Sequence, residues 1–171
     1  MTVEIREIDK DVYQKKQRKV VILVCSVFAI LGLSASALLR HYYGNAEGEN
    51  MMVNLTGVII GLLITIAIFS QVFKKPYFDD IRYTWNLKKR ALKIQNHRHK
   101  WEQQLQEGSQ TAATVLAFYH KATLQLQLLD KNEFGYNETV EREAKFLSEC
   151  EQLNLTPDAA QFSIDLLETL N

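Results

Sequence analysis

The histidines and carboxylates of this chain are the side chains from which a catalytic or metal site could be built. His97 and His99 are two residues apart in a stretch with a helical composition, so their side chains point about 200° apart and cannot share a metal ion. His120 stands alone beside Tyr119. The sequence has no Gly-rich phosphate loop, nucleophile elbow or cysteine cluster. We therefore expect no catalytic residues, no metal and no cofactor, and predict that the protein is not an enzyme.

Asp79 and Asp80 are adjacent carboxylates that follow Pro76. Neighbouring side chains on a helix diverge by about 100°, so this pair does not converge on one ion. In the first turn of a helix, both carboxylates would complement the positive end of the helix dipole. An enzyme that acts on lipid at the membrane surface is an alternative, and it would need a polar cluster around Asp79, Asp80 and His97.

Two apolar runs, Val20–Leu39 and Met51–Phe73, contain no Lys, Arg, Asp or Glu. A helix of about 20 residues crosses roughly 30 Å of hydrocarbon, and one central charge would cost about 2.5–3.5 kcal/mol. The runs therefore predict two membrane spans, joined as a hairpin by an external loop at residues 40–50. Two buried core helices of a soluble protein are the alternative interpretation.

The first run also has features of a cleavable secretory signal. Lys15, Lys16, Arg18 and Lys19 precede it, and Ala35-Ser36-Ala37 resembles a signal-peptidase site. However, the apolar stretch is longer than a usual signal core, and 19 residues come before it. We favour an uncleaved span. Cys25 then lies in the membrane and Cys150 outside it, so no disulfide is expected.

The distribution of Lys and Arg predicts the orientation of the hairpin. Basic residues flank the outer ends of both runs, whereas the loop contains only Arg40 against Glu47 and Glu49. Positive charge near span ends stays on the cytoplasmic side. We expect three segments: a cytoplasmic N-terminal segment (residues 1–19), the transmembrane hairpin (residues 20–73) and a cytoplasmic helical domain (residues 74–171).

Small residues recur at helical spacing in both runs. Gly57 and Gly61 are four residues apart, Thr65 extends their face by one turn, and Gly32 and Ser36 form a similar pair in the first run. Small residues let helix backbones approach closely. We expect these five residues to pack the two spans of one chain together, with homodimerisation through Gly57 and Gly61 as the alternative.

Charge is unevenly distributed along the remainder of the chain. Residues 74–100 carry nine Lys/Arg and two Asp (net +7), whereas residues 101–171 carry four Lys/Arg and twelve Asp/Glu (net −8). Basic residues beside a bilayer are attracted to anionic headgroups by about 1 kcal/mol each. We predict lipid contact for seven of them and expect no nucleic-acid partner: Lys74, Lys75, Arg82, Lys88, Lys89, Arg90 and Lys93.

Residues 76–171 have a helical composition, with few Gly or Pro. We predict a long juxtamembrane helix from Pro76 to about Glu107 and a second helix over Gln110–Leu129, with apolar residues at helical spacing. Asn137 can cap a third helix to about Leu153, with Val140, Ala144, Leu147 and Cys150 on its buried face. Thr156-Pro157-Asp158 predicts the start of a last helix to about Leu170. The predicted fold is all-α: a transmembrane hairpin, the long helix and a small antiparallel bundle.

Several short motifs also occur in a familiar order. Ile8-Asp9-Lys10 with Tyr13 precedes the first run, Asn54-Leu55-Thr56-Gly57-Val58 opens the second, and Pro76, Trp85-Asn86-Leu87-Lys88 and Leu129-Asp130 follow it. This order resembles a family of small bacterial two-span membrane proteins, a domain of unknown function (number three thousand and eighty-seven). The resemblance covers nearly the whole chain. It implies a location in the bacterial inner membrane, and it supplies no activity and no functional residues.

We expect a membrane-anchored interaction or scaffold protein that binds a protein partner or a second copy of itself. The spans contain no Lys, Arg, Asp, Glu or His, and such groups usually mark transport pathways. A small oligomeric channel or transport accessory subunit is the alternative.

Overall fold

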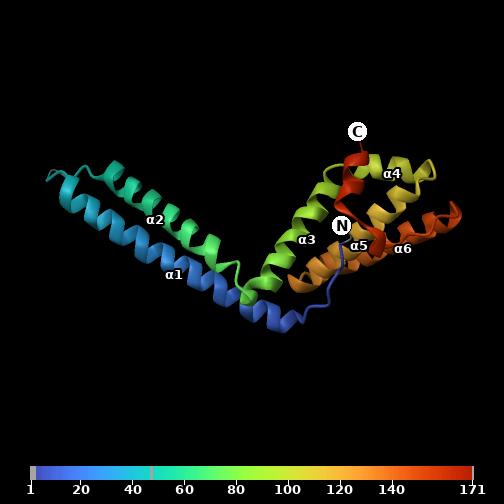
Figure 1. Ribbon diagram of the computed structural model, residues 1–171, viewed down its shortest axis with the longest axis horizontal. Coiled ribbons are helices and arrows are strands. Elements are labelled where there is room, and N and C mark those ends of the chain that lie inside the picture. Colours follow the sequence, from blue (N-terminus) through green and yellow to red (C-terminus); the bar gives the residue numbers. More distant parts are fainter. Residues whose placement is uncertain (1–2, 47, 171) are drawn as a thin grey trace. The chain divides into compact units, whose positions relative to one another are not determined.

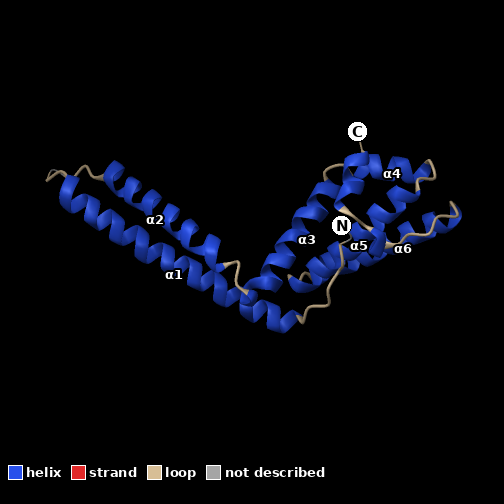
Figure 2. Ribbon diagram, in the orientation of Figure 1, coloured by secondary structure: helices blue, strands red, loops and turns tan. Residues whose placement is uncertain are grey.

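The computed structural model describes residues 3–46 and 48–170, and no β-strand occurs among them (Figures 1 and 2). The prediction of an all-helical chain is confirmed. The elements in chain order are α1 (Lys10–Tyr43), α2 (Met51–Val72), η1 (Pro76–Phe78), α3 (Asp79–Gln95), α4 (Arg98–Gln106), α5 (Gln110–Leu129), α6 (Glu133–Gln152), η2 (Ala159–Gln161) and η3 (Ile164–Thr169), where η marks a 3₁₀ segment.

The described residues form two compact units. One contains residues 12–82, and the other contains residues 3–11 together with residues 83–170. The division differs from the three predicted segments, because the first residues of the chain belong to the same unit as the C-terminal helices. We call these the hairpin unit and the helical unit.

The hairpin unit is built from α1 and α2, which lie side by side (Figure 1). Both helices are long and apolar enough to cross a membrane, in agreement with the two predicted runs. The predicted loop at residues 40–50 is shorter than expected because α1 continues to Tyr43. The chain then reverses with Gly48 at a φ of 91°, while the Asn50 side chain accepts a hydrogen bond from the Asn45 amide at 2.6 Å.

The helical unit is organised around α5, whose bounds match the predicted helix. Every residue from Ala112 to His120 is buried, so this helix is covered on all sides rather than along one stripe. The Ser109 hydroxyl caps its first turn by accepting from the Ala112 amide at 3.3 Å. Phe118 stacks on Phe162, with ring centroids 3.9 Å apart.

The predicted juxtamembrane helix from Pro76 to Glu107 is divided in the structure. A 3₁₀ turn at η1 leads into α3, which ends at Gln95, and α4 begins at Arg98. The amide of His97 donates to the carbonyl of Ile94, three residues back, which interrupts the α-helical ladder. Ile94 and Trp101, on either side of the break, are both fully buried.

The start of α6 corrects the prediction that Asn137 caps the third helix. The cap is Asn132, whose side chain accepts from the Gly135 amide at 3.0 Å. Gly135 therefore lies within the first turn of the helix and not in a loop. The predicted buried face is also wrong in part, because the helix buries Thr139, Phe146 and Cys150 and leaves Val140, Ala144 and Leu147 exposed.

The C-terminal segment does not form the predicted α-helix from Thr156 to Leu170. It forms two 3₁₀ segments, η2 and η3, separated by an extended Phe162 with φ −64° and ψ 129°. Phe162 is fully buried against Phe118. Its extended backbone leaves the carbonyl oxygen free to accept a hydrogen bond from the Val3 amide at 2.9 Å.

The N-terminal segment is fixed to the helical unit at a second point. The Arg6 amide donates to the Tyr83 hydroxyl at 2.8 Å, and the Tyr83 hydroxyl donates to the Gln125 side chain at 3.0 Å. Gln125 in turn donates to the Arg6 carbonyl. Val3 is itself part of the buried core, and Ile5 packs against it. Residues separated by most of the chain therefore share one core.

Candidate functional site

The five small residues predicted to pack the spans lie along one seam between α1 and α2. Gly32, Ser36, Gly57, Gly61 and Thr65 are all buried, although most of both helices is exposed. A Cβ atom added to Gly61 would lie 2.4 Å from the Gly32 Cα, and one added to Gly57 would lie 2.4 Å from the Ser36 Cα. The two backbones therefore meet where side chains are absent.

Two hydroxyl groups in the seam are satisfied locally. Ser36 donates to the Asn54 carbonyl across the seam at 2.8 Å. Thr65 donates to the Gly61 carbonyl of its own helix at 2.7 Å. Each hydrogen bond accommodates a polar group within an apolar pair of helices without a charge.

The basic residues predicted to contact lipid are mostly exposed. Lys74, Lys75 and Arg82 belong to the hairpin unit, whereas Lys88, Lys89, Arg90 and Lys93 lie on α3 within the helical unit. Arg82 forms an ion pair with Asp79, and Asp80 forms one with Lys16. Both carboxylates in the first turn of α3 are thus neutralised by cations of their own unit.

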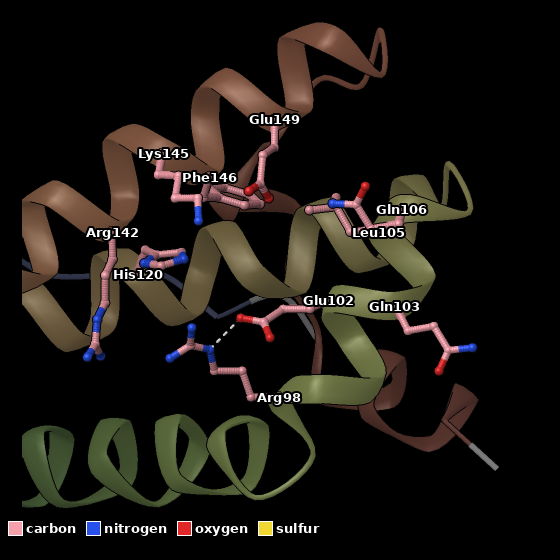
Figure 3. Close-up of a pocket in the computed structure, with 10 residues that line it drawn as sticks. All are labelled: Arg98, Glu102, Gln103, Leu105, Gln106, His120, Arg142, Lys145, Phe146 and Glu149. Atoms are coloured by element: carbon pink, nitrogen blue, oxygen red, sulfur yellow. Dashed lines mark hydrogen bonds and ion pairs between the residues drawn. The ribbon is translucent and has the colours of Figure 1, made fainter.

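A cleft lies between α4, α5 and α6 in the helical unit, and sequence reasoning did not predict it (Figure 3). We call it the α4–α5–α6 cleft. Its volume is about 590 Å³, within the range of small-molecule sites. Charged and polar groups make up most of the lining: Arg98, Glu102, Gln103, Leu105, Gln106, His120, Arg142, Lys145, Phe146 and Glu149.

His120 forms the floor of this cleft. The residue is only 6% exposed, and its ring stacks on Phe146 with centroids 5.0 Å apart. Its Nδ1 atom is buried and has no hydrogen-bond partner in the described part of the chain. Burial, followed by the positive charges of Arg98 and Arg142, lowers the pKa of His120 to about 4, although Glu102 opposes this. The imidazole is therefore neutral near pH 7.

Three cations surround His120 (Figure 3). Arg98 donates through Nε to Glu102 at 2.6 Å, and Arg142 pairs with Glu138, one turn away on α6. No ion pair of Lys145 occurs among the described residues. The lining residues carry three cations against Glu102 and Glu149, and Glu138, which is not part of the lining, is the ion-pair partner of Arg142.

The sequence carried one signal for this site that we did not use. His120 is an imidazole at the end of the buried stretch Ala112–His120, and a buried polar side chain without a hydrogen-bond partner needs a local explanation. The break between α3 and α4 brings Arg98 and Glu102 to the same place. Because we predicted a continuous helix there, Arg98 was not assigned to the surroundings of His120.

The family model described as "Protein of unknown function (DUF3087)" matches residues 3–167. The match covers both units and includes every residue of the seam and of the cleft. No curated protein and no solved structure matches the chain.

The seam predicts that the same substitution weakens helix packing at one glycine and leaves it unchanged at another. Gly61→Ala places a methyl group against backbone atoms of α1, whereas Gly32→Ala places it in ordinary contact, 3.8 Å from Phe28. Overpacking of this kind costs about 1–3 kcal/mol. We expect Gly61→Ala to separate the helices at a lower SDS fraction than the parent chain, and Gly32→Ala to match the parent within about 0.5 kcal/mol.

Energy transfer between dyes on Arg18→Cys and Lys74→Cys measures this separation during an SDS titration. A Cys25→Ala background removes the exposed thiol, while the thiol of Cys150 is fully buried. Equal midpoints for Gly61→Ala and Gly32→Ala would contradict the observed seam.

Burial of His120 predicts a pH-dependent stability of the helical unit. The folded pKa of about 4 lies below the ordinary value of 6.5, so the unfolded chain binds more protons between these values. The contribution of His120 is complete above pH 6.5 and is lost as the pH falls towards 4, by up to about 3 kcal/mol.

Urea unfolding of the detergent-solubilised chain measures this loss of stability. The readout is the fluorescence of the buried Trp101 in a Trp85→Phe background. His120→Gln should remove most of the pH dependence in that window, and His99→Gln, at an exposed position on α4, should keep it. A pH dependence that is unchanged in His120→Gln would argue against a neutral buried imidazole.

Proposed function

Because the chain belongs to the family described as Protein of unknown function (DUF3087), whose description gives no activity, we propose a function from the geometry: a membrane-anchored, non-enzymatic interaction module. In this proposal the hairpin unit is the anchor and spans the bacterial inner membrane twice. The helical unit lies on the cytoplasmic side and binds a protein partner.

Exposure of the apolar side chains supports the anchor. Only 11% of the most apolar window of α1 and 22% of that of α2 is buried, whereas the core helix of a soluble protein is mostly buried. Ile30 is 64% exposed and Leu63 is 60% exposed. An apolar surface of this size is unfavourable in water and suits lipid.

The N-terminal segment supports two complete crossings. Val3 and Arg6 make their hydrogen bonds with residues of the helical unit, which supports a topology with both ends of the hairpin on the same side of a bilayer. The surplus of Lys and Arg at these ends favours the cytoplasmic side. Cleavage at Ala35-Ser36-Ala37 would remove Val3 and Ile5 from the core, which favours an uncleaved chain.

An anchor fits the seam better than a pore does. The small residues of α1 and α2 are occupied by contact between the two helices, and the seam hydroxyl groups of Ser36 and Thr65 bond to backbone carbonyls. Exposed Tyr77 and Trp85, with Lys16 over the Tyr77 ring and Lys89 over that of Trp85, suit the interface with headgroups.

The exposed stripe of α6 carries the proposal of a protein partner. Val140, Ala144 and Leu147 recur at helical spacing and are exposed. We call them the α6 stripe. The helix that bears them has six glutamates against Arg142 and Lys145, so a second copy would place like charges opposite each other. A partner with a basic amphipathic helix fits both the apolar stripe and its acidic surroundings.

Cysteine labelling tests the topology. We expect the chain to sediment with membranes and resist carbonate extraction. In a Cys25→Ala background, Tyr43→Cys should react with an impermeant maleimide from the periplasmic side, and Phe134→Cys only after the inner membrane is permeabilised. Both aromatic residues are highly exposed, at 75% and 82%, so they form a matched pair. Labelling of Phe134→Cys in intact spheroplasts would exclude the proposed orientation.

Photo-crosslinking in native membranes tests the partner. A benzophenone residue at Leu147 should give an adduct with another protein, which Val140→Asp should reduce at least fivefold because a buried charge disfavours the contact. The same probe at exposed Lys121, outside the stripe, is the control. Adducts that contain only this chain would replace the basic partner with self-association, and recovery of monomer alone would reject the interaction proposal.

A further inference from the structure

We propose that the α4–α5–α6 cleft binds the phosphate group of a small ligand or of a lipid, held by Arg98, Arg142 and Lys145. This site is separate from the α6 stripe and does not depend on the interaction proposed for it. The anchor tests and the test below can therefore fail independently of each other.

The arrangement of charge carries the first step of the argument. Arg98 uses Nε for Glu102 and also interacts with the Tyr119 hydroxyl, which leaves further N–H donors of the guanidinium group to meet a second anion. Figure 3 shows the side chains of Arg98 and Arg142 reaching from α4 and α6 towards the space beside His120. Guanidinium groups bind phosphate through paired N–H donors, and a lysine adds a compact charge.

The present ion pairs do not block such a ligand. Arg142 and Glu138 are one helical turn apart on α6, and about half of each side chain is exposed. Exposed pairs of this kind contribute little, whereas a charge-assisted hydrogen bond to phosphate is strong, so a phosphate can displace Glu138 from Arg142. Lys145 has no ion pair among the described residues to give up.

The imidazole of His120 supplies a second, independent observation. It is a polar side chain that is more than nine-tenths buried, lines the cleft and has an unpartnered Nδ1. The charged groups that act on it are Arg98 and Glu102 from α4 and Arg142 from α6. Lys145 and Glu149 of α6 also line the cleft, and Tyr119 lies beside His120 on α5. Burial is the largest cause of the low pKa of His120, and a bound anion would offset the second cause, the positive field of the two arginines, and so raise that pKa.

The remaining lining determines the class of ligand. Leu105 and Phe146 provide an apolar wall, and Gln103 and Gln106 provide amide groups. A volume of about 590 Å³ exceeds that needed by inorganic phosphate alone. The cleft therefore suits a phosphate monoester with an organic part.

Titration of the full chain in neutral detergent or phosphatidylcholine nanodiscs tests the site. The soluble probes are inorganic phosphate and glycerol 3-phosphate, with sodium chloride at matched ionic strength as the blank. Nanodiscs with phosphatidic acid supply a phosphate monoester on a lipid, and nanodiscs without it are the control. Calorimetry measures affinity, and the ring signals of His120, assigned by their loss in His120→Gln, measure protonation.

We expect binding of at least one phosphate probe, accompanied by a rise in the pKa of His120. Arg142→Gln and Lys145→Gln should each weaken phosphate binding about tenfold or more, because each removes one charged donor. Lys100→Gln makes the same charge change at an exposed position of α4 outside the cleft and should change affinity less than twofold.

The soluble probes and the phosphatidic acid nanodiscs distinguish the source of the phosphate. Binding of glycerol 3-phosphate assigns a soluble ligand, and a response to phosphatidic acid alone assigns a lipid headgroup. The absence of binding to every probe would overturn the inference. Binding that Arg142→Gln, Lys145→Gln and Lys100→Gln weaken equally, or that leaves the His120 signals unchanged, would also overturn it.

Discussion

The close approach of two backbones, at Gly32 and Gly61 and one turn away at Ser36 and Gly57, is the constraint from which the hairpin is built. In the proposed membrane setting, lipid tails provide no hydrophobic force that pushes helices together, so association of the two helices relies on van der Waals contact. A seam without large side chains supplies that contact. It also leaves the large side chains, such as Ile30 and Leu63, free to cover the outside.

Burial of α5 on all sides has a comparable effect in the helical unit. A buried polar side chain costs free energy unless it meets a partner or solvent. His120 lies beside the α4–α5–α6 cleft, where α4 and α6 present charged side chains. The cleft is therefore a product of the central helix and of the break that precedes α4.

The sequence predicted the elements whose signal is local and left out those that depend on distant contacts. The apolar runs and the spacing of small residues indicated α1, α2 and their seam, and the apolar period of α5 gave its bounds. The first turn of α6 was misread, since Gly135 is typical of turns but here packs closely against Gln127 and Asn132. Phe162 is extended because its ring stacks on Phe118. The local sequence around Phe162 does not reveal a partner 44 residues away. The cleft was also not predicted, because its lining comes from three separate helices.

The contact between Val3 and Phe162 has a consequence for biosynthesis. The ribosome makes Val3 before Phe162, with both apolar helices in between. The N-terminal segment therefore waits, without this partner, until Phe162 has been made. During that interval Tyr83 and Gln125, which hold Arg6, are also made. In the proposed membrane protein, the hairpin can thus enter the bilayer before the contact between Val3 and Phe162 forms, and this order gives the newly made chain time to reach the bilayer.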